Sequence, residues 1–410
     1  MTERVYVLGG FQTDFAENWS RNGMEIADGM RLTVMRGLAG TKLEPTDVEV
    51  AHVGNFAAEL FCNQGHLGGV FAAVDPAFAG IPASRHEGAC ASGSLAILAA
   101  AADIEAGRYK LAAVLGVEQM RNVPGEKAAQ YIGGTAMWSG HEYLNARFPW
   151  PRVFSDVADE YDRRFGIKSE HLARIAEINF GNGRLNSNAQ TRRWTFNERS
   201  FKPDEEANPT IEGRIRKQDC GQITDGAAIV FLASESRARE HAQRLGVSID
   251  TFPYIKGWGH RTAPITYAAK VRASEGQPYV FPHVHGAITD AFRRAGISGV
   301  EQLNGIETHD CFTSTEYMAI DHFGITPPGQ SWRAIEEGDI EIDGRIPVNP
   351  SGGLIGGGHP VGATGVRMAL DCFKQTTGTA GEYQVKGART FATLNIGGSA
   401  TTTVSLIIGR

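Results

Sequence analysis

The hydrophobic pattern divides the chain into two stretches of alternating strands and helices with a different stretch between them. In the first, short apolar runs predict strands at residues 5–8, 48–53, 81–85 and 111–116. A helix over residues 24–38 is predicted by apolar side chains four positions apart, namely Ile26, Met30, Val34 and Leu38. An alanine-rich run predicts a second helix that ends near Gly107. This order of elements is typical of an α/β fold.

The alternation stops between residues 121 and 244, where aromatic, arginine and asparagine residues dominate. This composition predicts an inserted loop domain, or lid, whose chain returns to the main body near residues 225–235. After it, strands are predicted at residues 251–257, 305–308, 390–394 and 402–408, and helices at residues 283–294, 313–320 and 362–374. A chain of 410 residues is too long for one ordinary core, so we expect three parts, at residues 1–120, 121–244 and 245–410.

Composition and charge argue against several classes of protein. Hydrophobic residues make up 42% of the chain and charged residues 21%, which is typical of a globular protein. The net charge of −6 gives no reason to expect a nucleic acid or an anionic membrane as a partner. No apolar run reaches the ~20 residues of a membrane span, and the first residues show no signal-peptide pattern, so we expect a cytoplasmic location. The five cysteines are scattered without a Cys-x-x-Cys pair, which argues against disulfides and a zinc site.

A glycine-rich segment, residues 351–365, places His359 directly before Pro360. Glycine allows positive φ angles and a close approach of other groups, and proline is tolerated in the first turn of a helix. The segment therefore predicts a tight loop that brings His359 to one point and then starts a helix. The alternatives are a plain turn and a phosphate-binding loop, although no Lys-Ser/Thr pair follows the glycines as in a P-loop.

Two cysteines are candidates for chemistry. Cys90 lies among small residues where a helix begins, and the partial positive charge there favours a nucleophilic thiolate. Cys311 follows His309 and Asp310 at the end of a predicted strand, a usual position for functional groups in α/β folds. For each cysteine the alternative is a buried thiol that serves only packing. His309 and Asp310 could begin a metal site, but no third ligand lies at helical spacing, so we expect no metal.

The two alternating stretches resemble each other in their loops. Cys90 precedes Ser92-Gly93 and a helix, and His359 precedes Thr364-Gly365 and a helix. Two pseudo-symmetric α/β halves packed back to back would bring both loops to one cleft. A turn at residues 395–398 is predicted between the last two strands, and its backbone N–H groups could bind an oxyanion in that cleft. The alternative is a hairpin turn without a chemical role.

Six short motifs, in this order and spacing, resemble those of a thiolase, and more closely those of the sterol-carrier-protein type of thiolase. They are Cys90-Ala91-Ser92-Gly93, Gly116-Val117-Glu118-Gln119-Met120, Thr224-Asp225-Gly226-Ala227-Ala228, His309-Asp310-Cys311-Phe312, Asn349-Pro350-Ser351-Gly352-Gly353 and Gly358-His359-Pro360-Val361-Gly362-Ala363-Thr364-Gly365. The resemblance extends over nearly the whole chain. It implies an α/β thiolase fold, in which two pseudo-symmetric halves form a five-layered arrangement with an inserted loop domain that covers CoA.

The resemblance also implies a role for each catalytic candidate. Cys90 would be the nucleophile that takes the acyl group as a thioester. His359 would activate Cys90 and help to bind the thioester oxygen of the second substrate. Cys311 would be the acid/base at the α-carbon, because Asn395 stands where commoner thiolases have the cysteine of a Cys-x-Gly motif. His309 stands where other thiolases have an asparagine that holds a water in an oxyanion hole.

The remaining implied contacts concern the substrate. The backbone N–H groups of Cys90 and Gly397 would form the other oxyanion hole. The candidates for the substrate pocket are Asn395, Gly358 and Ser351. The candidates for CoA contacts, with a solvated charged face as the alternative, are Arg192, Arg193, Trp194 and Lys217. No cofactor is implied, since a CoA thioester is itself the substrate. The Gly356-Gly357 pair departs from the family, which often has bulkier or charged residues there.

The implied reaction is the reversible Claisen condensation or thiolysis of 3-oxoacyl-CoA, by a ping-pong mechanism through an acyl-cysteine. Acetyl-CoA C-acetyltransferases and 3-oxoacyl-CoA thiolases of lipid metabolism carry out this reaction. The resemblance further implies a homodimer or homotetramer. The alternatives are a thiolase-like subunit that works only with a protein partner in a condensing complex, and a non-catalytic acyl-CoA-binding scaffold. A ketoacyl synthase fits less well, because Cys311 stands beside His309.

Overall fold

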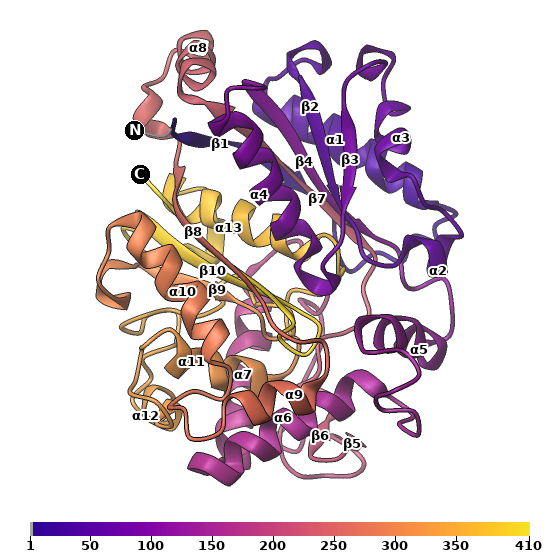
Figure 1. The fold of residues 1–410 in the computed structure, drawn as a ribbon, viewed down its shortest axis with the longest axis vertical. Helices are drawn as coiled ribbons and strands as arrows, with labels where there is room; N and C mark the ends of the chain where they lie inside the picture. The colour runs from indigo at the N-terminus through magenta and orange to yellow at the C-terminus, as the bar shows by residue number, and fades with distance from the viewer. Residues whose placement is uncertain (1–2) are drawn as a thin grey trace.

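The computed structural model describes residues 3–410, and its strands and helices form two α/β halves with a segment inserted between them (Figure 1). The N-terminal half contains β1 (Val5–Gln12), α1 (Ile26–Thr41), β2 (Val50–Gly54), α2 (Ala58–Cys62), α3 (Leu67–Ala72), β3 (Ala83–His86), α4 (Ser92–Glu105), β4 (Leu111–Glu118), β7 (Gly226–Ser234) and α8 (Glu235–Leu245). The inserted segment contains α5 (Gly125–Ala136), α6 (Pro149–Phe165), α7 (Ser169–Leu185), β5 (Thr210–Glu212) and β6 (Ile215–Arg216). The C-terminal half contains β8 (Tyr254–Thr262), α9 (Tyr267–Ala273), α10 (Pro282–Ala295), β9 (Gly305–Thr308), α11 (Thr313–His322), α12 (Ser331–Glu336), α13 (Thr364–Thr377), β10 (Thr390–Gly397) and β11 (Thr402–Gly409).

The two halves share one strand order. Within residues 3–410 the strands of the halves form a sheet in the order β3-β2-β4-β7-β1-β8-β11-β10-β9, in which a single pairing of Tyr6 with Tyr254 joins β1 to β8. In the N-terminal half β3 lies parallel to β2. In the C-terminal half a parallel bridge between Ile306 and Val348 takes the corresponding place beside β9. Each half therefore repeats the same path of the chain, which is the pseudo-symmetry that the sequence predicts.

Two helices lie between the sheets of the two halves. The α13 helix contacts β1, β4 and β7 on one side and β10 and β11 on the other, and α4 packs beside it on β2 and β4. On the outer faces, α1 covers the N-terminal strands and α10 covers β8 and β11, which completes five layers (Figure 1). A Cβ on Gly93 of α4 would lie 2.9 Å from the backbone nitrogen of Val366 in α13, so glycine at this position allows the two central helices to approach closely.

Every predicted strand and helix of the two halves is present, although β1, α1 and β4 extend beyond their predicted ends and α2, α3, α9 and α12 were not predicted. Three further boundary differences have a visible cause. The first is β8, which begins at Tyr254 rather than at residue 251, because residues 249–251 form a 3-10 helix. The second is α13, which begins at Thr364 after a turn that starts at Pro360. The third is the predicted turn at residues 395–398, because β10 continues through Gly397 and the turn follows it.

The inserted segment is mostly helical and packs under the C-terminal half. Its helices α6 and α7 contact α11, and α5 packs on α6 (Figure 1). The burial of α6 follows helical spacing, with Val153, Val157 and Tyr161 inside. No helix within residues 3–410 is long and apolar enough to cross a membrane.

Candidate active site

Cys90 lies in a 3-10 helix, Ala89–Ala91, between β3 and α4, and its side chain is completely buried. Its backbone turns sharply because Ala89 has a φ of 51°, and the Ser92 hydroxyl donates to the Ala89 carbonyl oxygen at 2.6 Å. Burial raises the pKa of the Cys90 thiol far above its ordinary value, although the Gly398 N–H donates to the sulfur and acts against this shift. The expectation that the helix start favours a thiolate is therefore wrong for the resting site, since burial outweighs it.

His359 is held in one tautomer by its neighbours. Its backbone N–H donates to the Thr224 hydroxyl at 2.9 Å, and its Nδ1 lies 2.7 Å from the Thr364 hydroxyl. Because that hydroxyl donates onward to the Pro360 carbonyl oxygen at 3.1 Å, it accepts from Nδ1–H, and we assign the lone pair of the ring to Nε2. The Nε2 atom is buried and has no hydrogen-bond partner among residues 3–410.

The fold brings the two predicted histidines close to the predicted nucleophile. One nitrogen of His309, one of His359 and the sulfur of Cys90 lie within 4.8 Å of one another. The two rings are nearly perpendicular, with their centroids 5.2 Å apart. Burial, with the Arg367 guanidinium as the second cause, lowers the pKa of His359 to about 3, and burial followed by His359 lowers the pKa of His309 well below its ordinary value. Both imidazoles are therefore neutral, and His359 Nε2 is free to accept a proton from the thiol.

Asn395 connects the nucleophile to His309. Its Nδ2 donates to the Cys90 carbonyl oxygen at 3.0 Å and lies 3.3 Å from His309 Nδ1, while its Oδ1 accepts from the Ser94 hydroxyl at 2.8 Å. Since the Asn395 amide donates, His309 Nδ1 accepts, and the ring proton of His309 belongs on Nε2. This arrangement leaves an N–H donor on His309 for a developing oxyanion.

Cys311 lies between β9 and α11 and is almost completely buried. Its sulfur lies 3.7 Å from the Thr315 hydroxyl. Burial, and after it the neighbouring Cys90, raises the pKa of Cys311 well above its ordinary value. A further thiol, that of Cys220, lies nearby, since its backbone bridges to Phe312 and the thiol contributes to the same shift. Nothing in the local sequence distinguishes Cys220, because only the folded chain brings it to Cys311.

The turn after β10 lies directly against the nucleophile. Gly397 packs so closely on the Gly88 carbonyl that no side chain would fit there. A buried ammonium group binds the turn: Lys270 Nζ donates to the Thr401 hydroxyl at 2.8 Å. His283 Nε2 lies 2.7 Å from the Ala400 carbonyl oxygen and holds the same turn. The oxyanion hole of Cys90 and Gly397 stays a prediction.

The loop that carries His359 is anchored on both sides of the histidine by buried carboxylates. Asp310 accepts from the backbone N–H of Leu354 at 2.6 Å, from that of Ile355 at 3.1 Å and from Asn179 Nδ2 at 2.9 Å. Glu118 accepts from the Gly362 N–H at 3.0 Å and also binds the loop after β2. Burial raises the pKa of Glu118 to about 7. Both residues stand in the motifs that carry the resemblance, although no local pattern indicates this anchoring.

Ser351 and Gly358, two predicted pocket residues, lie in that loop. The Ser351 hydroxyl donates to Glu307 at 2.6 Å and accepts from Arg367 at 2.7 Å, in a network that is fully buried. A Cβ on Gly358 would lie 3.2 Å from the side chain of Gln190. Their contact with substrate stays a prediction.

Close contact with α7 explains why the Gly356-Gly357 pair has glycine at position 356. A Cβ on Gly356 would collide with the carbonyl oxygen of Asn179, and Gly183 of α7 packs against the same residue. The inserted segment also binds the pair directly, because Thr191 donates to the Gly356 carbonyl oxygen at 2.8 Å. Glycine is needed here because two backbones touch.

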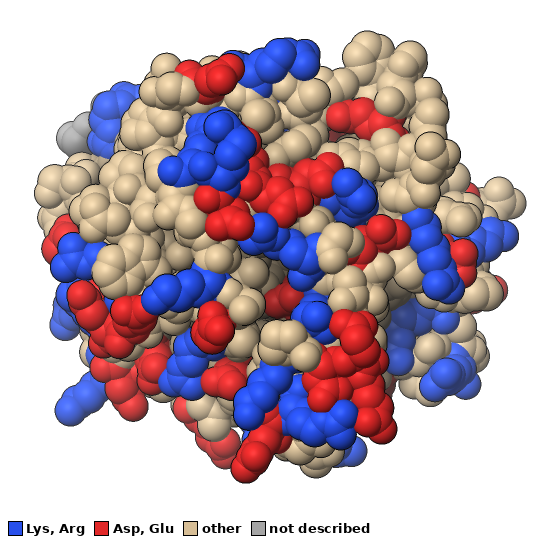
Figure 2. Space-filling model, turned by 90° about the horizontal axis from the view of Figure 1, so that it is seen from below, with Lys and Arg blue, Asp and Glu red and all other residues tan. Residues whose placement is uncertain are grey.

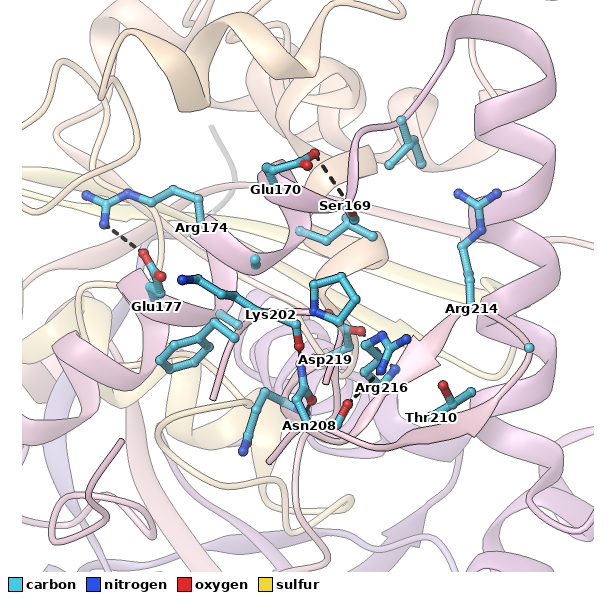
Figure 3. Close-up of a pocket in the computed structure, with 18 of the residues that line it drawn as sticks. Ser169, Glu170, Arg174, Glu177, Lys202, Asn208, Thr210, Arg214, Arg216 and Asp219 are labelled. Carbon is cyan, nitrogen blue, oxygen red and sulfur yellow. Dashed lines mark hydrogen bonds and ion pairs between the residues drawn. The ribbon is translucent and has the colours of Figure 1, made fainter. Parts of the chain in front are cut away.

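The predicted CoA contacts are spread over the inserted segment. Arg192 forms an ion pair with Asp14 at 2.6 Å, Trp194 packs on Phe180, and both Arg193 and Lys217 are exposed. A cavity of about 1040 Å³ lies between α7 and the β5–β6 hairpin (Figure 3). Its lining includes Arg174, Lys202, Arg214 and Arg216 but none of the four predicted CoA contacts.

Most of the positive charge at this cavity is already paired. Arg214 binds Asp162 and Arg216 binds Glu205, at 2.7 and 2.8 Å. Of the basic side chains that line the cavity, only that of Lys202 has no ion pair within residues 3–410. The face of the molecule seen from below shows acidic and basic side chains interspersed rather than one positive field (Figure 2).

The chain is similar to known proteins over nearly its whole length. The family models "Thiolase, N-terminal domain" and "Thiolase C-terminal domain-like" match residues 5–192 and 269–410. An acetyl-CoA acetyltransferase of Methanothermobacter thermautotrophicus is 31% identical over 406 residues, covering 99% of each chain. Sterol carrier protein 2 of Rattus norvegicus is 27% identical over 410 residues. The match covers 98% of this chain and 71% of that protein. A solved structure, "Ltp2-ChsH2(DUF35) aldolase", superposes with a TM-score of 0.78 at 19% identity, covering 100% of this chain and 98% of that one, which shows a shared fold.

Proposed function

Since the chain belongs to the thiolase family and is an acyltransferase of that type, we propose that it acts as an acetyl-CoA C-acetyltransferase or a 3-oxoacyl-CoA thiolase. One observation carries this proposal: a ring nitrogen of His359, whose Nε2 has no hydrogen-bond partner within residues 3–410, and a ring nitrogen of His309 lie within 4.8 Å of the Cys90 sulfur. Because the thiol and the imidazole are both neutral at rest, the proton leaves the sulfur only as the bond to carbon forms.

The first half-reaction loads the nucleophile. Cys90 sulfur attacks the carbonyl carbon of an acyl-CoA while its proton passes to His359 Nε2. The carbonyl oxygen becomes an oxyanion bound by backbone N–H groups, of which each is worth about 10²–10³-fold in rate. The C–S bond to CoA then breaks, and the departing CoA sulfur takes the proton from His359. The products are an acyl-Cys90 thioester and free CoA.

The second half-reaction forms the carbon–carbon bond. Cys311 first passes its thiol proton to His359 Nε2. The resulting thiolate removes a proton from the α-carbon of a second thioester, whose oxygen receives hydrogen bonds from the N–H groups of His309 and of protonated His359. The resulting carbanion attacks the acyl carbon on Cys90. The Cys90 sulfur leaves and takes the proton from His359, so 3-oxoacyl-CoA is released and the site is restored. Thiolysis follows the same steps in reverse.

The test measures two readouts in two thiol variants. Cleavage of acetoacetyl-CoA by CoA should be lost in both Cys90→Ala and Cys311→Ala. Transfer of a labelled acyl group onto the protein should be lost only in Cys90→Ala, because Cys311 acts after loading. Cys62→Ala is the matched control, since Cys62 is half-buried on α2 and not part of the cluster of Cys90 and the two histidines. Full cleavage activity in Cys311→Ala would overturn its role as the base.

A second candidate is an acyltransferase that needs a protein partner in a condensing complex. Two observations favour it: the arginines at the cavity of the inserted segment are paired with carboxylates, and the structural neighbour is named after two components. A partner would then supply cations for the CoA phosphates. Activity that appears only after co-expression with such a partner supports this candidate. A malonyl-thioester assay separates either candidate from a ketoacyl synthase, and an inactive protein that still binds acyl-CoA would instead indicate a scaffold.

The assembly proposed is a homodimer in the cytoplasm that needs no resident cofactor. The β3 strand lies at one edge of the sheet. In two copies related by a twofold axis, the two β3 strands could pair antiparallel. Each copy would then cover the β3 edge of the other. Light scattering should give twice the mass of the 44.2 kDa chain, or four times that mass for a tetramer.

A further inference from the structure

Three atoms of the kind that bind soft metal ions face one point in the site. They belong to Cys90, His309 and His359, lie within 4.8 Å of one another, and come from three separate loops. All three side chains are at most 7% exposed. In a zinc site the Zn–S distance is about 2.3 Å and the Zn–N distance about 2.0–2.1 Å, so ligand atoms lie roughly 3.5 Å apart. Binding an ion would therefore require side-chain rotations that bring the three atoms closer together.

A second observation points independently to a ligand. His359 Nε2 is a buried acceptor without a hydrogen-bond partner anywhere in the described chain, and buried polar atoms are seldom left so. Its opposite nitrogen is held by the Thr364 hydroxyl at 2.7 Å. Metal-bound histidines usually have this outer hydrogen bond, because it fixes the tautomer that presents a lone pair to the ion.

We propose that Cys90, His309 and His359 form a reversible inhibitory site for Zn²⁺. Binding replaces the S–H bond of Cys90 with an S–Zn bond and releases one proton to the solvent, while both imidazoles bind as neutral ligands. His309 takes part in the tautomer whose proton is on Nδ1, which costs its hydrogen bond from Asn395 and limits the affinity. The fourth position of the ion is left to water.

The donor set selects the ion. One thiolate and two imidazoles suit Zn²⁺, whereas Mg²⁺ and Ca²⁺ require oxygen ligands, which the three side chains do not supply. The nearby Arg367 forms ion pairs with Glu307 and Asp371 at 3.1 and 2.9 Å. Its positive charge is therefore balanced and does not repel a bound cation strongly. Bound Zn²⁺ occupies the nucleophile, so acyl transfer stops until a chelator removes the ion.

The experiment titrates Co²⁺, a spectroscopic substitute for Zn²⁺, into the metal-free protein. We expect one ion per chain, a near-ultraviolet thiolate-to-cobalt band and the release of one proton. Cys90→Ser should lose the band, and Thr364→Val should bind about 10–100-fold more weakly. Cys311→Ala and the control Cys62→Ala should bind as wild type does. An unchanged band in Cys90→Ser, or binding equal in all variants, would overturn the proposal.

A labelling measurement on the wild-type chain keeps the test independent of how the variants fold. Zn²⁺ should protect Cys90 from alkylation, with the site identified by peptide mapping, and Mg²⁺ should not. Alkylation of Cys90 at the same rate with and without Zn²⁺ would contradict the site. Neither measurement uses a substrate, so both stand whether or not the proposed reaction does. Reversible inhibition by Zn²⁺, by contrast, rests on the proposed function.

Discussion

The loop that carries Cys90 and the loop that carries His359 occupy equivalent places in the two halves, yet they are held in different ways. The Cys90 loop is short, and its polar contacts come partly from within, where Glu87 and Ser92 bind the backbone of Ala89, and partly from the opposite half. Asn395 of β10 binds the Cys90 carbonyl, and Gly398 donates to the sulfur. The carbonyl oxygen and the sulfur of Cys90 itself are therefore held by an uncharged side-chain amide and a backbone N–H group.

The His359 loop is long and is held by ionisable side chains. Asp310 and Glu118 accept its backbone N–H groups, the first from the same half and the second from the other half. The inserted segment also binds the His359 loop, through the hydrogen bond of Thr191 and through the close contact of Gly356 with α7. Pseudo-symmetry thus brings the two loops together, whereas the position of the imidazole depends on all three parts of the chain.

The largest effect is expected on activity when the imidazole of the His359 loop is removed. His359→Gln keeps a polar group of similar size but removes the proton acceptor at Nε2. Since a positioned acid/base is worth about 10²–10⁴-fold, we expect kcat/KM to fall by that factor. Steady-state cleavage of acetoacetyl-CoA measures the loss. A variant within about threefold of wild type would show that His359 does not take the thiol proton.

Stability should show how far the His359 loop depends on buried charge. Asp310→Ala leaves two backbone N–H groups and the Asn179 amide without their acceptor, so we expect a loss of roughly 3 kcal/mol in the free energy of unfolding. Urea denaturation measures it, and Asp343→Ala on the surface is the control. A loss no larger than that of the control would mean that the carboxylate does not hold the loop.

The contact between the inserted segment and the His359 loop can be tested by substituting two glycines. Gly356→Ala forces a methyl group against the Asn179 carbonyl and should cost about 1–3 kcal/mol. Gly181→Ala, on the same α7 helix, meets nothing within 4 Å and should instead stabilise by about 0.5–1 kcal/mol. Thermal and urea unfolding of both variants measure the difference. Equal stabilities would refute the close contact.

The pH dependence of stability should differ between wild type and His359→Gln. The pKa of His359 is lowered from 6.5 to about 3 in the folded chain, so between these values the unfolded chain binds more protons. Stability from this group is thus present above pH 6.5 and is lost as the pH falls, by about 2 kcal/mol between pH 7 and pH 5. His359→Gln should lack that portion of the decline. Parallel curves for the two proteins would contradict burial of a neutral imidazole.

The smallest effect is expected on the Cys90 side. Ser94→Ala removes one hydrogen bond, the one that orients Asn395, and should cost about 1 kcal/mol of stability. Activity should fall moderately, because Asn395 also orients His309. Ser236→Ala, at an exposed position on α8, is the control. A loss as large as that of Asp310→Ala would remove the difference between the two loops.

The sequence was sufficient for the family, the α/β fold and the order of the elements, because these depend on local spacing and on contiguous motifs. The family models and the 31% identical acetyltransferase confirm that assignment. The motifs also named Cys90, His309 and His359, which the structure brings within 4.8 Å. Their roles, that of Cys311 and the CoA contacts stay predictions.

The charge state and the support of the site depend on the folded chain. The neutral state of both histidines and the raised pKa of Cys90 follow from burial, which no local pattern reports. The glycine at position 356 is explained by a helix more than a hundred residues earlier in the chain. Spacing along a chain determines which groups are available, but desolvation and contact between distant segments determine what each group does.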